Sequence, residues 1–409
     1  MSYFNYVNQK LFIENSSIHK IAKKNKTPFY LYSSEGIKKN YLNFEKVFKK
    51  VNPLICFSAK ANTNLSILKI LGNLGSGVDV VSGGELLKAI KAGIKPNKIV
   101  FSGVGKTASE IKMAIDKKIL LINVESESEA RLINKIGKKL NKKVSVGFRI
   151  NPNIDARTHR KISTGRSENK FGVSIKSFAQ LYKVRKNFTN LKIEAISVHI
   201  GSQILSATPY KKTLNVLLSM IRNLNLKLKY VDLGGGFGIS YTKKDKAINL
   251  SKYAKYVLDF KKKLKCKIIF EPGRSIVGNT GFLISKIQYI KKGQNKNFII
   301  LDAGMNDFMR PALYDAVHEI IPVIKEKRMD PTKIEFVGPI CETTCKFNSY
   351  KNYQKINEND LVVITNVGAY GSSLSSNYNT KPLIAEILVR KNKFKIIKKK
   401  QDLIKLINS

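Results

Sequence analysis

The feature that most constrains the fold is a regular alternation of strand-like and helical segments between residues 54 and 270. Segments with the apolar spacing of a helix, such as Leu65–Leu74 and Thr213–Leu224, separate short apolar runs. This alternation indicates a parallel sheet, and its extent is the size of a (β/α)8 TIM barrel. A doubly wound open sheet is the alternative from the pattern alone. The predicted strands are Leu54–Phe57, Val78–Val81, Ile99–Phe101, Leu120–Val124, Val144–Ile150, Ala195–Ile200, Tyr230–Leu233 and Ile268–Phe270.

The chemically unusual residues of this region favour the barrel, because they follow the carboxyl ends of the predicted strands. Lys60 follows the first strand, His199 ends the sixth, the glycine run Gly234–Gly238 follows the seventh, and Glu271–Arg274 follows the eighth. In a barrel these ends meet at one rim, where barrel enzymes keep their active sites.

A second domain is expected after the barrel. Beyond Arg274 the chain has strand-like segments, such as Ile276–Ile290 and Leu383–Val389, without helices of barrel length between them. We therefore predict a barrel over residues 34–272 and a mostly antiparallel β-barrel or sandwich domain from residues 1–33 and 273–409. The early strand Phe29–Tyr32 is expected to join the β domain.

Each unusual residue has an ordinary structural explanation when taken alone, but together they match one cofactor. Lys60 lies between apolar and small residues, and a desolvated lysine becomes a nucleophilic amine. The glycine run can bring backbone N–H groups close to a phosphate, although it lacks the sequence of a nucleotide P-loop. His199 can stack on a flat ring, and Glu271 can keep a ring nitrogen protonated. This is the set that pyridoxal 5′-phosphate requires.

The chain resembles the fold type III pyridoxal-phosphate decarboxylases over about residues 25 to 390. The resemblance is specific because separate motifs occur in the family's order. They are Phe57–Asn62, Gly77–Leu86, Arg149–Pro152, Asn169–Gly172, His199–Ser202, Gly234–Gly238, Glu271–Arg274, Met309–Tyr314, Gly338–Glu342 and Gly368–Gly371. Within the family, the likeness is greatest to the branch that converts meso-2,6-diaminopimelate to L-lysine and CO2.

The resemblance implies a role for each site residue. Lys60 is the Schiff-base lysine, His199 packs on the pyridine face and Glu271 pairs with the ring nitrogen. Cys341 is the proton donor, and Glu342 binds the distal ammonium of the substrate. The phosphate end is held by Gly236, Gly273, Arg274 and Tyr370, and the substrate carboxylate by Arg310 and Tyr314 with Arg274 and Tyr370 nearby. The family pattern also implies an obligate homodimer in which the Cys341–Glu342 loop enters the neighbouring subunit's active site.

Two positions depart from the family pattern. Cys345 stands where an aspartate is usual, three residues after Glu342, which puts the support of that loop in doubt. Lys381 stands where an arginine-rich turn is common, and lysine does not reproduce the bidentate pairing of arginine.

Other functions remain as alternatives. A related decarboxylase would act on ornithine, arginine or carboxynorspermidine, but Arg310 and Glu342 favour a substrate with both a carboxylate and an ammonium at its far end. A racemase of the same barrel type is expected to carry a second base in place of Cys341. A catalytically dead homologue is expected to have lost Lys60 or Cys341, and both are present.

Composition limits the remaining function classes. The 74 Lys and Arg residues against 29 Asp and Glu give a formal charge of +45, which raises nucleic-acid binding as a possibility. The lysines are spread along the chain without a nucleic-acid motif, so we expect solvated faces and no specific nucleic-acid partner. The 4 cysteines do not suggest a disulfide framework or a metal site. With neither a signal peptide nor a membrane-spanning apolar run, a cytoplasmic protein is expected.

Overall fold

The computed structural model describes residues 3–156, 158–162, 164–165, 168–242 and 245–408. The chain divides into two compact units. The barrel unit contains Tyr41–Ile239 and Lys246–Ser275, and the β unit contains Met1–Asn40, Ser240–Asp245 and Ile276–Ser409.

The barrel unit contains a closed parallel sheet, which confirms the predicted TIM barrel and rules out the open sheet. Neighbouring strands follow the order β9-β11-β12-β13-β5-β6-β7-β8, and a pairing of β8 with β9 closes the ring. The strands are β5 (Leu54–Ser58), β6 (Gly77–Val80), β7 (Ile99–Phe101), β8 (Leu121–Val124), β9 (Val144–Asn151), β11 (Leu191–Ser197), β12 (Tyr230–Asp232) and β13 (Lys267–Phe270), with the short β10 (Val173–Ser174) beside β9. The sixth strand ends at Ser197, so the predicted end at Ile200 is wrong and His199 lies in the loop that follows.

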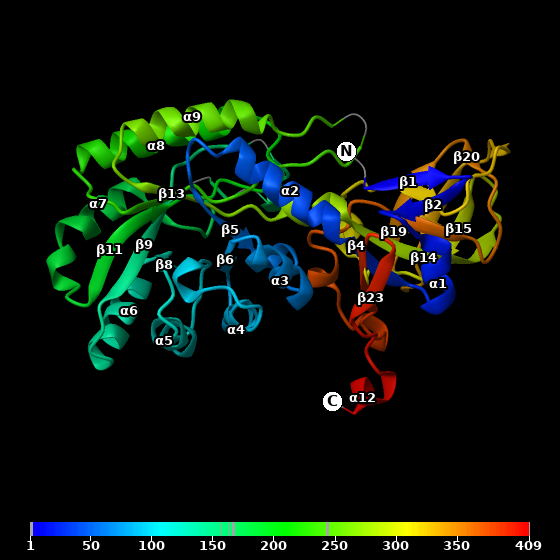
Figure 1. The fold of residues 1–409 in the computed structure, drawn as a ribbon, viewed down its shortest axis with the longest axis horizontal. Helices are drawn as coiled ribbons and strands as arrows, with labels where there is room; N and C mark the ends of the chain where they lie inside the picture. The colour runs from blue at the N-terminus through cyan, green and yellow to red at the C-terminus, as the bar shows by residue number, and fades with distance from the viewer. Residues whose placement is uncertain (1–2, 157, 163, 166–167, 243–244, 409) are drawn as a thin grey trace. The chain divides into compact units, whose positions relative to one another are not determined.

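Helices connect the barrel strands, and the sequence specifies where several of them begin. Ser82, Thr107 and Ser126 each accept a hydrogen bond from the backbone N–H of a glutamate three residues later, as good N-caps do. Figure 1 shows the successive helices α3 to α6 along one side of the barrel, and α8 beside α9. The helices are α2 (Ser34–Val47), α3 (Leu65–Asn73), α4 (Gly83–Lys91), α5 (Ala108–Asp116), α6 (Glu127–Lys139), α7 (Ile175–Lys183), α8 (Thr208–Asn223) and α9 (Leu250–Lys262).

The interior of the barrel changes from apolar to polar along the strands. Buried residues toward the amino ends form one apolar cluster, made of Leu54, Cys56, Val100, Leu121, Ala195 and Ile269. Because alternate residues of a strand face the same side, positions two or four residues further on also point inward. Those positions are Ser58, Ser102, Asn123 and Glu271, and all are buried. The sequence thus places a polar layer at the carboxyl end of the barrel.

The β unit is built around a mostly antiparallel sheet, as predicted. Its strand order is β19-β18-β15-β14-β4-β22-β23, with β21 pairing both β14 and β16. Within this sheet only the β22–β4 and β15–β18 pairs are parallel among the described residues. The strands are β4 (Phe29–Ser33), β14 (Gly281–Lys291), β15 (Asn297–Leu301), β16 (Ile320–Pro322), β18 (Ile334–Val337), β19 (Lys346–Tyr350), β21 (Leu361–Ile364), β22 (Ala385–Arg390) and β23 (Lys393–Lys398).

Smaller elements complete the β unit. The strand predicted from Ile276 begins at Gly281, because the residues before it form α10 (Arg274–Val277) and a 3-10 turn (Gly278–Thr280). The other elements are β1 (Phe4–Val7), β2 (Lys10–Ile13), β3 (Ser16–Ser17), α1 (Ile18–Lys24), α11 (Arg310–Tyr314), β17 (Met329–Asp330), β20 (Tyr353–Gln354) and α12 (Leu403–Ile407). No helix in the described part of the chain is both long and apolar enough to span a membrane.

Candidate active site

Lys60 lies immediately after β5, on a short 3-10 turn formed by Ala59–Ala61. Its Nζ donates a hydrogen bond to Oδ2 of Asp79 at 3.1 Å. The Asp79 side chain is fully buried, whereas 35% of the Lys60 side chain is exposed. Desolvation of the amine is therefore only partial, unlike the burial that the sequence suggested. The Asp79 carboxylate stabilises the ammonium and fixes its position near the barrel interior.

The polar layer of the barrel forms a hydrogen-bonded network beside Asp79. Nδ2 of Asn123 donates to Oγ of Ser102 at 3.1 Å and to Oδ2 of Asp232 at 2.9 Å. Oγ of Ser102 donates to Oε1 of Glu271 at 3.3 Å. Asn123 and Asp232 are completely buried. The network therefore links β7, β8, β12 and the end of β13, and it fixes the Glu271 carboxyl group.

Glu271 and Asp232 form a hydrogen-bonded carboxyl pair. Burial, followed by the charges of Asp232 and Asp79, raises the pKa of Glu271 well above its ordinary value. Burial also raises the pKa of Asp232, although its hydrogen bonds oppose that rise. Two buried carboxylates in contact cannot both ionise readily, so the pair retains a proton. Such a pair can share that proton with a basic ring nitrogen.

His199 lies in the loop after β11 and is partly buried. Burial first, and then the charges of Lys60 and Arg149, lower its pKa well below the ordinary value. Its Nδ1 accepts a hydrogen bond from the backbone N–H of Gly235 at 3.2 Å, so a neutral ring carries its proton on Nε2. A neutral, flat imidazole in a fixed orientation suits stacking against an aromatic cofactor.

The glycine run after β12 has room for no side chain at two successive positions. A Cβ atom on Gly235 would lie 2.1 Å from the carbonyl oxygen of Glu271. At Gly236 it would lie 2.2 Å from the carbonyl oxygen of Gly201, and the φ angle there is +89°. The chain is thus held in a close-packed turn of the kind that can present backbone N–H groups to a phosphate.

The end of the eighth strand packs against the turn that carries Lys60. A Cβ atom on Gly273 would lie 2.9 Å from Cβ of Ala61, and the N–H of Ser58 donates to the carbonyl oxygen of Pro272 at 3.1 Å. Arg274 is buried, and its Nη2 donates to Oγ of Ser202 at 3.1 Å. The barrel unit therefore brings its predicted site residues together: Lys60, His199, Gly236, Glu271, Gly273 and Arg274.

Sequence reasoning missed several residues of this centre. Asp79 lies within the motif Gly77–Leu86 but has no role predicted from the sequence, and neither has Asn123 or Asp232. The sequence did contain a signal for them. Alternate residues of a strand point to the same side, and in these strands an inward-facing position becomes polar at the end of an apolar run. A further buried ion pair joins Nη1 of Arg149 to Oε1 of Glu125 at 2.9 Å. It supports the same rim, because the arginine also approaches the carbonyl oxygen of His199.

The other predicted site residues lie in the β unit. Arg310 and Tyr314 are on α11, and Arg310 is buried. Cys341 and Glu342 are exposed, and Oε1 of Glu342 accepts a hydrogen bond from the hydroxyl of Tyr378 at 2.5 Å. Tyr370 has a left-handed φ of +57°, a strained conformation for a bulky residue and one often found at functional sites.

Cys345, which stands in place of the family's aspartate, is buried inside the Cys341 loop. Its sulfur accepts a hydrogen bond from the N–H of Met305 at 3.3 Å, and its carbonyl oxygen accepts one from Gly338 at 2.8 Å. Hydrogen bonds to the thiol and to the backbone of Cys345 therefore hold the loop in place. Lys381, the second departure, donates its backbone N–H to the carbonyl oxygen of Tyr378 at 3.3 Å.

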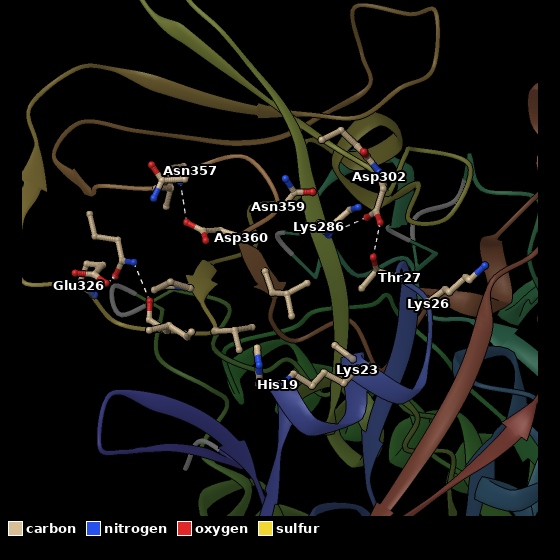
Figure 2. A pocket seen from close by; sticks show the side chains of 18 residues that line it. His19, Lys23, Lys26, Thr27, Lys286, Asp302, Glu326, Asn357, Asn359 and Asp360 are labelled. Atoms are coloured by element: carbon tan, nitrogen blue, oxygen red, sulfur yellow. Dashed lines mark hydrogen bonds between the residues drawn. The ribbon is translucent and has the colours of Figure 1, made fainter.

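The β unit also contains a cavity of about 610 Å³, which is lined by residues other than the predicted site residues. Figure 2 shows that basic side chains such as Lys23 and Lys286 and the acidic Asp302 surround it. Asp302 already accepts hydrogen bonds from Thr27 and Ser285. The predicted residues of the β unit do not take part in this cavity.

Comparisons with known proteins identify the relatives of the chain. Residues 34–278 match the family described as pyridoxal-dependent decarboxylase, pyridoxal binding domain. The chain is 42% identical to the diaminopimelate decarboxylase of Aquifex aeolicus, over 98% of this chain and 95% of the relative. It is 45% identical to that of Helicobacter pylori, over 92% and 94% of the two chains.

Solved structures agree with the sequence matches. A crystal structure of the Helicobacter pylori diaminopimelate decarboxylase complexed with L-lysine superposes with a TM-score of 0.91 at 42% identity, covering 95% of this chain and 98% of that chain. A diaminopimelate decarboxylase from M. jannaschii gives a TM-score of 0.94 at 33% identity, covering 99% and 97%.

Proposed function

This chain belongs to the diaminopimelate decarboxylase family of pyridoxal-dependent decarboxylases, and we propose that it converts meso-2,6-diaminopimelate to L-lysine and CO2. One observation in the barrel supports this reaction most directly. The amine of Lys60 and the Glu271–Asp232 carboxyl pair are held on the same polar layer. These are the nucleophile and the ring-nitrogen partner that pyridoxal phosphate needs.

The residues present fit the cofactor. The Gly235 and Gly236 backbone has no room for side chains and suits the phosphate end, together with Gly273, Arg274 and Tyr370. The neutral ring of His199 suits the pyridine face. When bound, pyridoxal phosphate supplies an electron sink for the charge that is left when CO2 departs.

The protein's own groups perform the remaining tasks. Lys60 would hold the cofactor in place through its amine. Glu271 would pair with the ring nitrogen, and the negative charges of Asp232 and Asp79 that act on this carboxyl group also favour a protonated ring. Cys341 donates a proton to the carbon that has lost CO2. Because this thiol is exposed, it requires a closed site to act without competition from water.

Substrate recognition is assigned to the β unit. Arg310 and Tyr314 hold the carboxylate that the substrate retains, while Glu342 holds the ammonium beside it. A substrate end that carries both charges requires both signs of charge in the site. This pairing separates diaminopimelate from ornithine, whose far end offers only an ammonium.

We place the enzyme in the cytoplasm as a homodimer with shared active sites. The four cysteines are free thiols, which suits a reducing compartment. The dimer follows from the family resemblance of the Cys341–Glu342 loop, which is exposed in a single chain.

A CO2-release assay tests the proposed function. The purified protein with pyridoxal phosphate is compared on meso-diaminopimelate, L-ornithine, L-arginine and L-lysine. We expect efficient release from diaminopimelate alone. Faster release from ornithine or arginine would instead establish the related basic amino-acid decarboxylase, and a protein inactive on all four would refute the proposal.

A further inference from the structure

We infer that His318 is a positioning residue that fixes the Arg310 guanidinium for the carboxylate retained by the substrate. The inference rests on the proposed function, because it takes Arg310 as a carboxylate ligand. His318 itself lies outside every motif that the sequence singled out.

The hydrogen bonds of His318 determine its protonation state. Its Nε2 lies 2.8 Å from Nη1 of Arg310, and its Nδ1 lies 2.9 Å from the carbonyl oxygen of Thr365. Arginine is always charged and can only donate, so Nε2 must accept. A carbonyl can only accept, so Nδ1 must carry the proton. His318 is therefore the neutral Nδ1–H tautomer, and it links the backbone immediately after β21 to Arg310.

Aromatic packing holds both members of the pair. The His318 side chain is completely buried. Its ring meets Phe308 edge-on at 4.7 Å and Tyr241 at 4.9 Å between centroids. The guanidinium carbon of Arg310 lies 4.7 Å from the centroid of the Tyr241 ring. The imidazole cannot turn away from Arg310 without breaking these contacts and the bond to Thr365.

This arrangement explains why an acceptor is useful at position 318. A long arginine side chain loses rotamer freedom when it clamps a ligand, and that cost weakens binding. His318 restrains one corner of the guanidinium before the substrate arrives. Because the imidazole is neutral, it provides this restraint without the competing negative charge that an aspartate or glutamate would bring close to the bound carboxylate.

Two conservative variants separate the two hydrogen bonds. A glutamine amide reaches the place of Nε2 and keeps an acceptor for Arg310. An asparagine amide reaches only the place of Nδ1, so it keeps a donor for Thr365 and loses the acceptor. We expect His318→Asn to raise KM for diaminopimelate about tenfold, the effect of losing one hydrogen bond to a charged group. We expect His318→Gln to remain within about threefold of the unchanged protein.

The readouts are KM, kcat, the visible absorption of bound cofactor, and competitive inhibition by two probes. L-Lysine retains the carboxylate, whereas pentane-1,5-diamine has the same two amines without it. In His318→Asn, inhibition by lysine should weaken in parallel with the rise in KM, while inhibition by the diamine and the cofactor absorption stay unchanged. His19→Gln is the matched control, since His19 lines the separate cavity of Figure 2, and it should change none of these values.

Equal weakening of both probes, or an unchanged KM in His318→Asn, would overturn the inference. If His318→Asn does not fold, a tenfold rise of KM in His318→Gln would also overturn it, and retention of the original KM would support it. If the wild-type protein were inactive on diaminopimelate, the proposed function would be refuted instead. Failure of the His318 inference and failure of the proposed function are therefore distinguishable.

Discussion

The chemistry of Lys60 depends on one buried neighbour. Ser58 and Lys60 both donate to Oδ2 of Asp79, at 2.9 and 3.1 Å. Asp79 therefore orients the amine toward the barrel interior, while the buried side chains of Ala59 and Ala61 anchor the 3-10 turn that carries it. The same carboxylate adds to the negative potential that raises the pKa of Glu271. A single aspartate thus influences both ends of the proposed cofactor site.

Replacing Lys60 with alanine should abolish decarboxylation and the visible absorption band of the bound cofactor, because the amine that anchors the aldehyde is removed. The measurement is an absorption spectrum of the purified protein after incubation with pyridoxal phosphate. Lys69→Ala, an exposed lysine on α3, is the control and should keep both properties. A colourless unchanged protein would contradict the role of Lys60.

Replacing Cys341 with alanine should lower kcat about a hundredfold or more, because a general acid contributes at least roughly that factor, with little change in cofactor affinity. Steady-state kinetics and cofactor titration separate the two effects. Cys266→Ala changes a thiol in the barrel unit and should leave kcat unaltered. A parallel loss of kcat and cofactor affinity would indicate that Cys341 is structural.

The turn between β12 and Phe237 requires glycine at several positions. Gly234 and Gly236 have φ angles of +61° and +89°, which favour glycine over other residues. The N–H of Ile204 donates to the carbonyl oxygen of Gly236 at 2.9 Å, and the hydroxyl of Tyr210 donates to that of Gly235 at 2.9 Å. These bonds hold the turn closed around its backbone.

Gly236→Ala should weaken pyridoxal phosphate binding strongly, because the new Cβ meets the backbone of Gly201. Gly75→Ala is a matched control, since Gly75 also has a φ of +89° but has open space where the Cβ would lie. The control should lose only about 1 kcal/mol of stability and keep its cofactor. Cofactor titration and urea unfolding of both variants provide the comparison. If both variants lost cofactor binding equally, the positive φ angle alone, and not the contact with Gly201, would explain the loss.

The whole molecule carries a formal charge of +45, because it has only 29 Asp and Glu residues against 74 Lys and Arg residues. Several of these acids are used in its interior, at Asp79, Asp232, Glu271 and Asp307. Burial raises the pKa of Asp307 to about 6. Its carboxylate nevertheless accepts hydrogen bonds from the N–H of Gly304 at 2.9 Å and from Asn306 at 3.2 Å.

The stability of the β unit should therefore depend on pH through Asp307. Its ordinary pKa of 3.8 rises to about 6 on folding, so between these values the folded protein binds a proton that the unfolded chain has released. This contribution to stability is present below about pH 4 and is lost as pH rises through about 6. Asp307→Asn should thus gain up to about 3 kcal/mol relative to the unchanged protein between those limits, at 1.36 kcal/mol per unit. Urea unfolding across this range measures it, and a difference independent of pH would contradict the assignment.

If Cys341 acts in the neighbouring subunit, two inactive variants should restore each other. Mixed and exchanged Lys60→Ala and Cys341→Ala proteins should form dimers with one intact site, which gives about a quarter of the unchanged activity after random exchange. Each variant alone should remain far below that value. Sedimentation should show a dimer throughout, and a mixture no more active than its components would show that both residues act within one chain.

The sequence by itself determined the barrel, the mostly antiparallel β unit and the family, because periodicity and strand-end motifs are local properties. It also identified Lys60, His199 and Glu271 as neighbours, since parallel strand ends converge at one rim. Only the tertiary structure decided which interior groups meet. Ser102 contacts Glu271 although 169 residues separate them, and Asn123 reaches Asp232 across the barrel. Closure of the sheet creates such contacts, and no local pattern encodes them. For the same reason the partial exposure of Lys60 and the pairing of His318 with Arg310 became visible only in the folded protein.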